Sequence, residues 1–315
     1  MIPPPPKRGA ARLAAAVAAL LVLALFATLP GTAMAERVYL GYGRLLTNDQ
    51  WGDLRDRYRT GAYTSSRVWG PAWTGRLPTR PGALLELRFH GETMTPAALR
   101  FPAPGDRPYA GALSFGMHTH YRQGAAEISL GGDVVVTGPQ TRLSDLQSAL
   151  HEVLDAAKPS DRVLANQIPD GTHPTLVVEV GRALSAGRTR LRPFVEARTG
   201  AESLLRVGAD LTIGSFGEGE LLVREVSTGH RYRVIAARQR GVSFVAGADV
   251  ARVFDSVFLP ADRGYRLTDR ARVRAGLHWQ GRRNALFYGL TWLGPEFEAQ
   301  PEGQLVGALR LDLRF

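Results

Sequence analysis

The chain of 315 residues contains no cysteine. An exported protein without cysteine has no disulfide framework and no thiol for nucleophilic catalysis or metal binding. After its first 35 residues, the chain also lacks any run of the roughly 18 to 20 apolar residues that a membrane helix needs. These absences exclude disulfide-stapled folds, thiol enzymes and helical membrane spans for the rest of the chain.

The N-terminal segment has the layout of a secretory signal. Three cations precede an apolar run over residues 13–29, and the small-residue triplet Ala33-Met34-Ala35 follows. This layout predicts a signal peptide over 1–35, cleaved after Ala35, and one mature domain over 36–315. The net charge of +10 fits an anionic partner. Nucleic acid is not expected as that partner, because the exported chain has no clustered basic tail.

The C-terminal segment alternates between apolar and polar residues. Leu309, Leu311 and Phe315 fall on one face of an extended chain, whereas Arg310 and Asp312 fall on the other. A terminal aromatic after such alternation is typical of an outer-membrane β-barrel, which turns apolar residues to lipid and polar residues inward. A half-buried strand of a periplasmic sandwich has the same period, so this segment alone leaves both folds open.

The same alternation recurs in 84–90, 188–198 and 268–279, and it favours the barrel. We therefore predict an all-β fold, a transmembrane antiparallel β-barrel of about twelve strands in the outer membrane. The expected strands are 37–47, 57–69, 82–91, 109–121, 125–137, 174–185, 188–199, 203–213, 242–254, 267–280, 283–293 and 304–315. The region 214–241 is open between a further strand and a long loop. Interior arginines should pair with inward acids such as Glu86, Glu179, Glu196 and Asp312.

One segment, 140–157, has a helical rather than a strand period. Apolar residues recur there at spacings of three and four, at Leu143, Leu146, Leu150, Val153 and Ala157. A polar row runs beside them, at Gln147, His151 and Asp155. The sequence therefore predicts a short amphipathic helix inserted in a loop.

Antiparallel order gathers several polar groups at one end of the barrel. If the first strand runs outward, the connections after strands one, three, five, nine and eleven all open on the outer face. This end then carries Asn48-Asp49, the loop 92–108, the segment 138–173 and the loop 296–300, with Thr60 near the outer start of the second strand. It faces the outer leaflet, where a Gram-negative bacterium presents lipopolysaccharide.

Short motifs spread through the mature chain carry a family resemblance. They are Asn48-Asp49, Arg59-Thr60-Gly61, Met94-Thr95-Pro96, Asp106-Arg107-Pro108-Tyr109-Ala110-Gly111, Gly138-Pro139, Gln147 with His151, Asn166-Gln167, and Glu296-Phe297 with Gln300. In their order and spacing, the chain resembles the outer-membrane lipid A 3-O-deacylases. The resemblance implies a twelve-stranded barrel that uses calcium to hydrolyse an ester-linked acyl chain of lipid A. It also implies lipid A or lipopolysaccharide as substrate and a monomer surrounded by outer-membrane lipid.

The resemblance assigns roles to residues at the outer rim. His151 is the expected base that activates water, and Asp49 is the expected calcium ligand. Asn48 is expected to offer an amide to the oxyanion, Thr60 to orient substrate or water, and Arg100 to stabilise the oxyanion or bind a phosphate. From the residues alone, a solvated histidine on an exposed helix and a simple Asn-Asp turn are the favoured interpretations.

Two positions depart from the family pattern. Arg100 stands where the family has a lysine, and Ala157 stands where an acidic metal ligand is expected. Asp155 or Glu152 is the nearest acid that would replace that ligand. The departures keep two alternatives open, namely an outer-membrane phospholipase, which would need a serine beside the histidine, and a non-catalytic barrel that has lost its metal site.

Overall fold

The computed structural model describes residues 37–237 and 239–313. The predicted signal segment, its cleavage after Ala35 and the terminal Phe315 lie outside the described residues. Within them, fifteen strands form. They are β1 Val38–Asn48, β2 Tyr58–Gly70, β3 Leu85–Thr95, β4 Ala110–Gln123, β5 Ala126–Thr137, β6 Gly171–Gly181, β7 Leu184–Ala186, β8 Thr189–Thr199, β9 Glu202–Ile213, β10 Leu221–Arg224, β11 Arg231–Ile235, β12 Gly241–Ser256, β13 Arg270–Gln280, β14 Ala285–Leu293 and β15 Gln304–Asp312.

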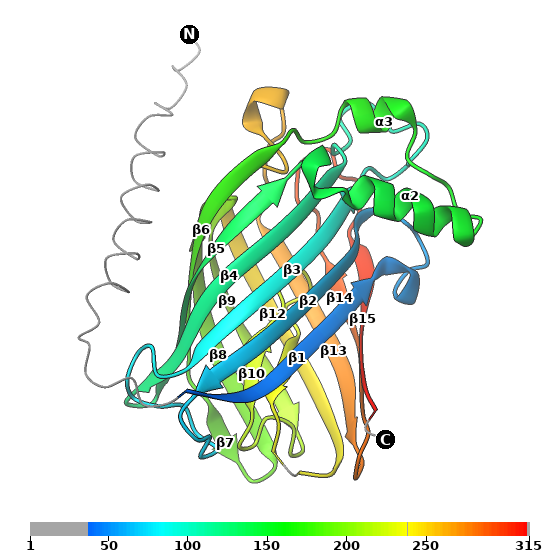
Figure 1. Cartoon of the computed structure of the whole chain (residues 1–315). Helices are drawn as coiled ribbons and strands as arrows, with labels where there is room; N and C mark the ends of the chain where they lie inside the picture. The colour runs from blue at the N-terminus through cyan, green and yellow to red at the C-terminus, as the bar shows by residue number, and fades with distance from the viewer. Residues whose placement is uncertain (1–36, 238, 314–315) are drawn as a thin grey trace.

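The strands close into an antiparallel barrel (Figure 1). Thirteen of them form one sheet in the order β6-β5-β4-β3-β2-β1-β15-β14-β13-β12-β9-β8-β7, and β6 also pairs with β8. The strand β7 has three residues and pairs with β8 beyond the end of β6. The remaining twelve therefore form the closed ring, which confirms the predicted fold class and strand number.

The two-residue period decides which side chains face the outside of the ring. On β13, Arg272 and Arg274 are buried at 5% and 3% exposure, whereas Val273 and Leu277 are 55% and 57% exposed. On β15, Leu311 is 44% exposed and Ala308 is fully buried. A closed ring pairs all its backbone groups, so its outer wall can present apolar side chains to lipid.

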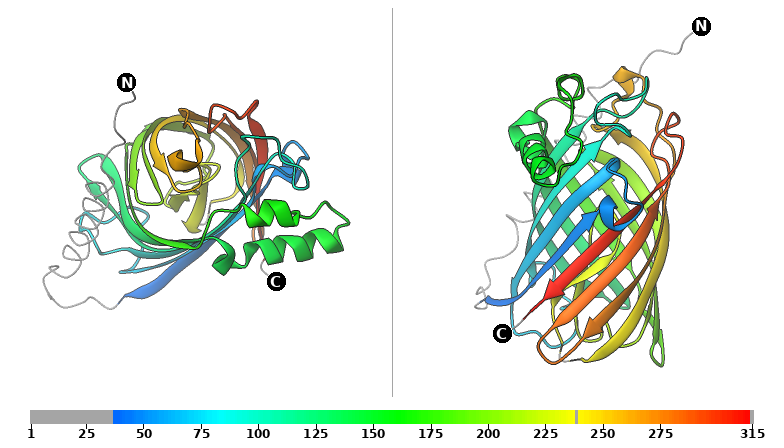
Figure 2. Two further views of the ribbon diagram at one scale, coloured as in Figure 1. Left: turned by 90° about the horizontal axis from the view of Figure 1, so that it is seen from above. Right: turned by 90° about the vertical axis from the view of Figure 1, so that its right-hand side faces the viewer.

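The helices gather at one end of the barrel, where the connections after β1, β3 and β5 also lie (Figure 1). They comprise α2 Leu143–Val153 and α3 Asp161–Ala165, with the short 3-10 turns η1 Asp49–Trp51, η2 Pro139–Thr141 and η3 Ala261–Arg263. Seen from above, α2 lies outside the ring of strands (Figure 2). Among the described helices, none has the length and apolar composition to cross a membrane.

The region that the sequence left open, 214–241, forms a hairpin of β10 and β11 inside the ring. Val223, Tyr232 and Val234 share one buried apolar cluster with Leu45 of β1 and Phe287 of β14. Strands from both sides of the β1–β15 seam thus pack on the hairpin. The hairpin fills part of the lumen, so the barrel interior is a packed core there.

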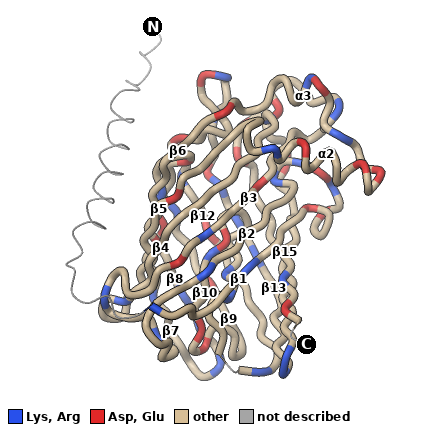
Figure 3. The backbone as a smooth tube through the Cα atoms, viewed as in Figure 1, with Lys and Arg blue, Asp and Glu red and all other residues tan. Residues whose placement is uncertain are grey.

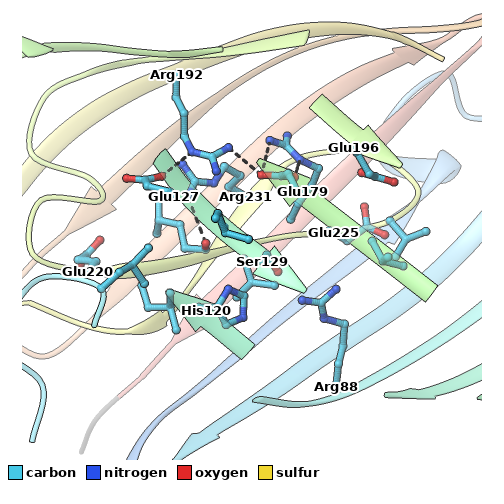
Figure 4. A pocket seen from close by; sticks show the side chains of 18 of the residues that line it. Arg88, His120, Glu127, Ser129, Glu179, Arg192, Glu196, Glu220, Glu225 and Arg231 are labelled. Carbon is cyan, nitrogen blue, oxygen red and sulfur yellow. Dashed lines mark hydrogen bonds and ion pairs between the residues drawn. The ribbon is translucent and has the colours of Figure 1, made fainter. Parts of the chain in front are cut away.

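Charged residues recur along the strands of the barrel (Figure 3), and many of their side chains are buried. Arg192 reaches Glu127 at 2.6 Å and Glu179 at 2.7 Å, in the pocket of Figure 4. The expected inward acids are paired, through Glu86 with Arg88, Glu179 with Arg192 and Arg224, Glu196 with Arg198, and Asp312 with Arg310. This confirms the predicted pairing, since a buried charge without a partner is costly.

Candidate active site on the outer wall

The site begins where β1 ends at the rim. Asn48 caps the turn η1, because its Oδ1 accepts a hydrogen bond from the backbone N–H of Gln50 at 2.8 Å. This capped turn places the next residue, Asp49, in the protein, where it is fully buried. The Asn-Asp pair therefore makes a turn and, through the same geometry, delivers a buried carboxyl group.

Among the described residues, the Asp49 carboxyl group has two hydrogen-bond donors and no ion-pair partner. Its Oδ2 accepts from the backbone N–H of Arg57 at 2.8 Å, and its Oδ1 accepts from the Thr60 hydroxyl at 3.2 Å. Burial raises the pKa of Asp49 to about 8, and the nearby negative charges of Asp56 and Asp53 add to the rise. A buried carboxyl in this state favours the arrival of a positive charge.

Thr60 reaches Asp49 because of an irregularity in β2. The β2–β3 register shifts between Arg59 and Gly61, so Thr60 is the extra residue of a bulge. Arg59 binds Glu92 and Glu296, whereas the neighbouring Thr60 hydroxyl contacts Asp49 and Asp56. The bulge thus separates two neighbouring side chains into two different networks.

The helix α2 turns its polar side toward Asp56, which contacts the bulge residue Thr60. Gln147 and His151 are buried, whereas Leu146, Leu150 and Val153 are 64%, 51% and 83% exposed. In a water-soluble setting the apolar stripe of a helix packs inward. The structure has the opposite orientation, and it brings the imidazole and amide down onto the wall.

Both nitrogens of His151 have partners. Nδ1 lies 2.6 Å from the backbone oxygen of Ala157, and Nε2 lies 3.1 Å from Oδ2 of Asp56. Because a carbonyl oxygen only accepts, Nδ1 carries a proton and donates it. Nε2 is the nitrogen that can gain or lose a proton, and its contact with Asp56 is a hydrogen bond when a proton lies between the two atoms.

Asp56 links His151 to Asp49 through Thr60. The Thr60 hydroxyl hydrogen-bonds to Asp56 and also lies within hydrogen-bond distance of Asp49. The sequence analysis missed Asp56. It stands in a loop that also holds Asp53, and turn acids of this kind give no periodic signal that separates a site residue from a surface residue.

The oxygen atoms around this cluster suit a hard cation such as calcium. Oε1 of Gln147 and Oδ1 of Asp53 are buried without a hydrogen-bond partner, while Gln147 Nε2 lies 3.5 Å from Oδ1 of Asp56. Calcium takes oxygen ligands from carboxylates and amides. In the described residues, no group of three or more His, Cys, Asp or Glu side chains has the arrangement of a metal site. Asp49 and the orphaned oxygens are thus the local donors that fit.

Three of the predicted site residues lie apart from this cluster. Arg100 is exposed, and among the described residues its side chain has no hydrogen bond or ion pair, although its backbone oxygen accepts from Ser160. Glu152 is exposed and pairs with Lys158 at 2.8 Å. Asp155 is exposed too, with a positive φ of 52°. The structure therefore brings together Asn48, Asp49, Thr60 and His151, and Asp56 lies among them.

Comparison with protein families supplies the identification. The family model described as "Outer membrane protein LpxR" matches residues 21–315. The chain belongs to the LpxR family. Among curated proteins, no sequence matches the chain.

Solved structures extend this likeness to the fold. LpxR from Salmonella typhimurium matches with a TM-score of 0.71 and 17% identity, over 87% of this chain and all 100% of that one. The β domain of the Bordetella autotransporter Brka matches with a TM-score of 0.39 and 12% identity, over 88% and 99%. The translocator domain of NalP from Neisseria meningitidis has a TM-score of 0.35 and 11% identity, over 95% and 98%. The LpxR match supports the twelve-stranded ring, and the outer-membrane family agrees with the apolar outer wall.

Proposed function

We propose that this LpxR-family chain is a lipid A deacylase of the outer membrane. It hydrolyses the ester-linked 3-O-acyl chain of lipid A at the outer leaflet, with His151 as the general base. One observation carries the proposal: α2 holds His151 against Asp56, and the Thr60 hydroxyl links Asp56 to the buried Asp49. Ester hydrolysis needs a base that takes a proton from water and an electrophile that stabilises the oxyanion. His151 would be the base, and a cation bound at Asp49 would be the electrophile.

The proton-transfer role of His151 follows from its two contacts. The bond from Nδ1 to Ala157 fixes the tautomer, so Nε2 takes the proton from the attacking water. Asp56 then stabilises the imidazolium that forms, because its carboxylate already lies 3.1 Å from Nε2. The acid missing at position 157 is thereby offset in part, since the Ala157 backbone and Asp56 together orient the ring.

Asp49, with the buried oxygens beside it, would hold calcium. When bound there, calcium supplies a Lewis acid that polarises the ester carbonyl. The Asn48 side chain uses Oδ1 in its cap and leaves its amide N–H groups for the developing oxyanion. Thr60 orients Asp49 and Asp56. Arg100, exposed on the rim, would contact a lipid A phosphate.

The exposed apolar side of α2 supports a lipid substrate. Leu146, Leu150 and Val153 continue an apolar outer wall that includes Leu46 and Leu87, which are 42% and 51% exposed. Because the cluster lies between this helix and the wall, an acyl chain would enter from the lipid and not from the packed lumen. Among the described residues, no serine hydroxyl hydrogen-bonds to His151, so a serine phospholipase mechanism has no support.

The deciding assay measures acyl release. The purified protein is incubated with lipid A and, separately, with phospholipid, in calcium or in chelator, and the released acid is identified by mass spectrometry. We expect release of a 3-O-linked chain from lipid A that depends on calcium. Release from phospholipid alone would replace the proposal by the phospholipase, and release from neither would favour a non-catalytic barrel.

Replacing Asp49 by Asn should abolish calcium binding and leave the protein folded. Because the pKa of Asp49 is about 8, the carboxyl is largely protonated at pH 7 and its amide is a close neutral match. Without metal, we expect the free energy of unfolding of the variant to lie within about 1 kcal/mol of that of the parent. Calcium should raise the unfolding temperature of the parent and leave that of Asp49→Asn unchanged. The control is Asp145→Asn, at an exposed position of α2; equal calcium shifts in all three proteins would remove Asp49 from the metal site.

A further inference from the structure

Five buried or nearly buried arginines line one small cavity inside the barrel. The cavity measures about 30 Å³ and lies against β2, β8, β9 and β13 and the turn between β10 and β11. Its arginines are Arg59, Arg198, Arg206, Arg270 and Arg272. It is on the lumen side of the wall, because Arg59 faces away from the Thr60 cluster.

The carboxylates around the cavity are fewer than the arginines that bind them. The five lining arginines contact five acids, namely Glu92, Glu196, Glu202, Glu296 and Asp249. Two of these acids serve further cations, because Glu296 also binds Arg107 and Asp249 also binds Arg274. Arg274 also binds Asp210, so seven guanidinium groups draw on six carboxylates. The cluster holds an excess of positive charge.

Several guanidinium N–H groups consequently have no acceptor. The buried nitrogens without a hydrogen-bond partner include Arg198 Nε, Arg206 Nε, Arg270 Nε and Nη2, and Arg272 Nη2. The side chains of Arg206, Arg270 and Arg272 are 5–7% exposed. These orphaned donors belong to four residues that line the same cavity. A buried donor without an acceptor costs free energy, and the cost is larger for a charged group.

Water alone satisfies such a site poorly. Each water accepts two hydrogen bonds but brings two protons of its own, which then need acceptors. A monatomic anion accepts from several N–H groups, brings no proton and offsets the excess charge. A cavity needs about 10–15 Å³ for each water, so this one has room for about two waters or for one small ion.

We propose that this cavity binds a single small inorganic anion of the chloride class. The anion accepts hydrogen bonds from the Arg270 guanidinium and from neighbouring arginines of the lumen. Its site adjoins Arg59, whose backbone N–H donates to Gln304 at 2.8 Å and which precedes the bulge residue Thr60. The bound ion would thereby brace the wall segment that carries the rim cluster. The proposal is argued from residues of the lumen and does not depend on the proposed hydrolysis.

Bromide replaces chloride and can be located by its anomalous scattering. Crystals of the full mature protein in detergent are grown in bromide, for the parent, Arg270→Met and Arg252→Met. The control residue Arg252 is an exposed arginine paired with Asp269. We expect one anomalous peak in the cavity of the parent and of Arg252→Met, and none there in Arg270→Met. No peak in the parent cavity, or peaks at the surface as an adventitious ion only, would overturn the proposal.

A measurement in solution tests the same proposal without Arg270→Met, in case that variant does not fold. The unfolding midpoint in detergent is compared between chloride and gluconate at equal ionic strength, for the parent and for Arg198→Met. Gluconate is too large for the cavity, so the midpoint of the parent should be higher in chloride. Arg198→Met, which removes one orphaned donor, should show a smaller difference. A midpoint that is the same in both salts, or an equal difference in parent and variant, would contradict an anion site.

Discussion

Replacing His151 by Ala is expected to lower the rate of acyl release from lipid A by about 10²–10⁴-fold, the usual contribution of a general base. The imidazole is the only group of the rim cluster with a nitrogen held for proton transfer, between Ala157 and Asp56. Its removal leaves Asp49 and the metal ligands in place. The measurement is the initial rate of acyl release in saturating calcium, with the unfolding temperature taken in parallel.

A second rim histidine provides the matched control. His173 lies near the start of β6, and its Nε2 is 3.2 Å from the Thr137 hydroxyl. His173→Ala should keep the parental rate because that ring contacts no member of the rim cluster. If His151→Ala keeps more than a tenth of the parental rate while it is folded, another group supplies the base.

Asp56 acts on the reaction through His151, so its variants separate positioning from folding. Asp56→Asn should lower the rate by on the order of 100-fold, because the ring loses its charged partner and its fixed orientation. Asp56→Glu should recover part of the rate, since it restores the carboxylate. A purely structural role would instead give equal losses in both variants, together with a lower unfolding temperature.

The strands could be predicted because lipid and lumen impose a strict period of two. The segment 268–279 shows arginines at alternate positions, and the structure places Arg272 and Arg274 inward and Val273 outward. The antiparallel order then fixed which connections share an end, and it brought His151 to the same rim as Asp49. Pattern and topology were therefore sufficient for the ring and for the neighbourhood of the site.

Three features depended on contacts that no local pattern encodes. The hairpin of β10 and β11 packs its apolar residues inside the ring, where the sequence left a strand and a loop equally open. Asp56 became a site residue only through its distance to His151. The helix α2 was found from its period, but the period cannot say which side packs, because lipid outside the protein reverses the rule that holds in water.

The orientation of α2 predicts that its exposed apolar side contacts the membrane. Around the helix, the buried polar side, the apolar residues Leu150 and Val153, and the exposed acid Glu152 occupy three separate sectors. Since the chain has no native cysteine, Leu150→Cys and Glu152→Cys can each carry a single environment-sensitive fluorophore. In vesicles, the label at position 150 should be blue-shifted and quenched by brominated lipid. The label at position 152 should behave as a solvent-exposed control.

Charges on that apolar sector should lower the turnover of lipid A in vesicles and leave the turnover of soluble esters unchanged. Near the interface each inserted charge costs about 1 kcal/mol or less, so Leu150→Asp with Val153→Asp should weaken the contact by roughly 30-fold at most. The helix would then bind the membrane less tightly while its buried side keeps His151 and Gln147 against Asp56. Turnover of vesicle-embedded lipid A should fall accordingly, whereas a dissolved short-chain ester needs no membrane contact and should report any direct damage to the cluster. Equal losses on both substrates would mean that the outward side of α2 supports the fold of the site and does not hold it against lipid.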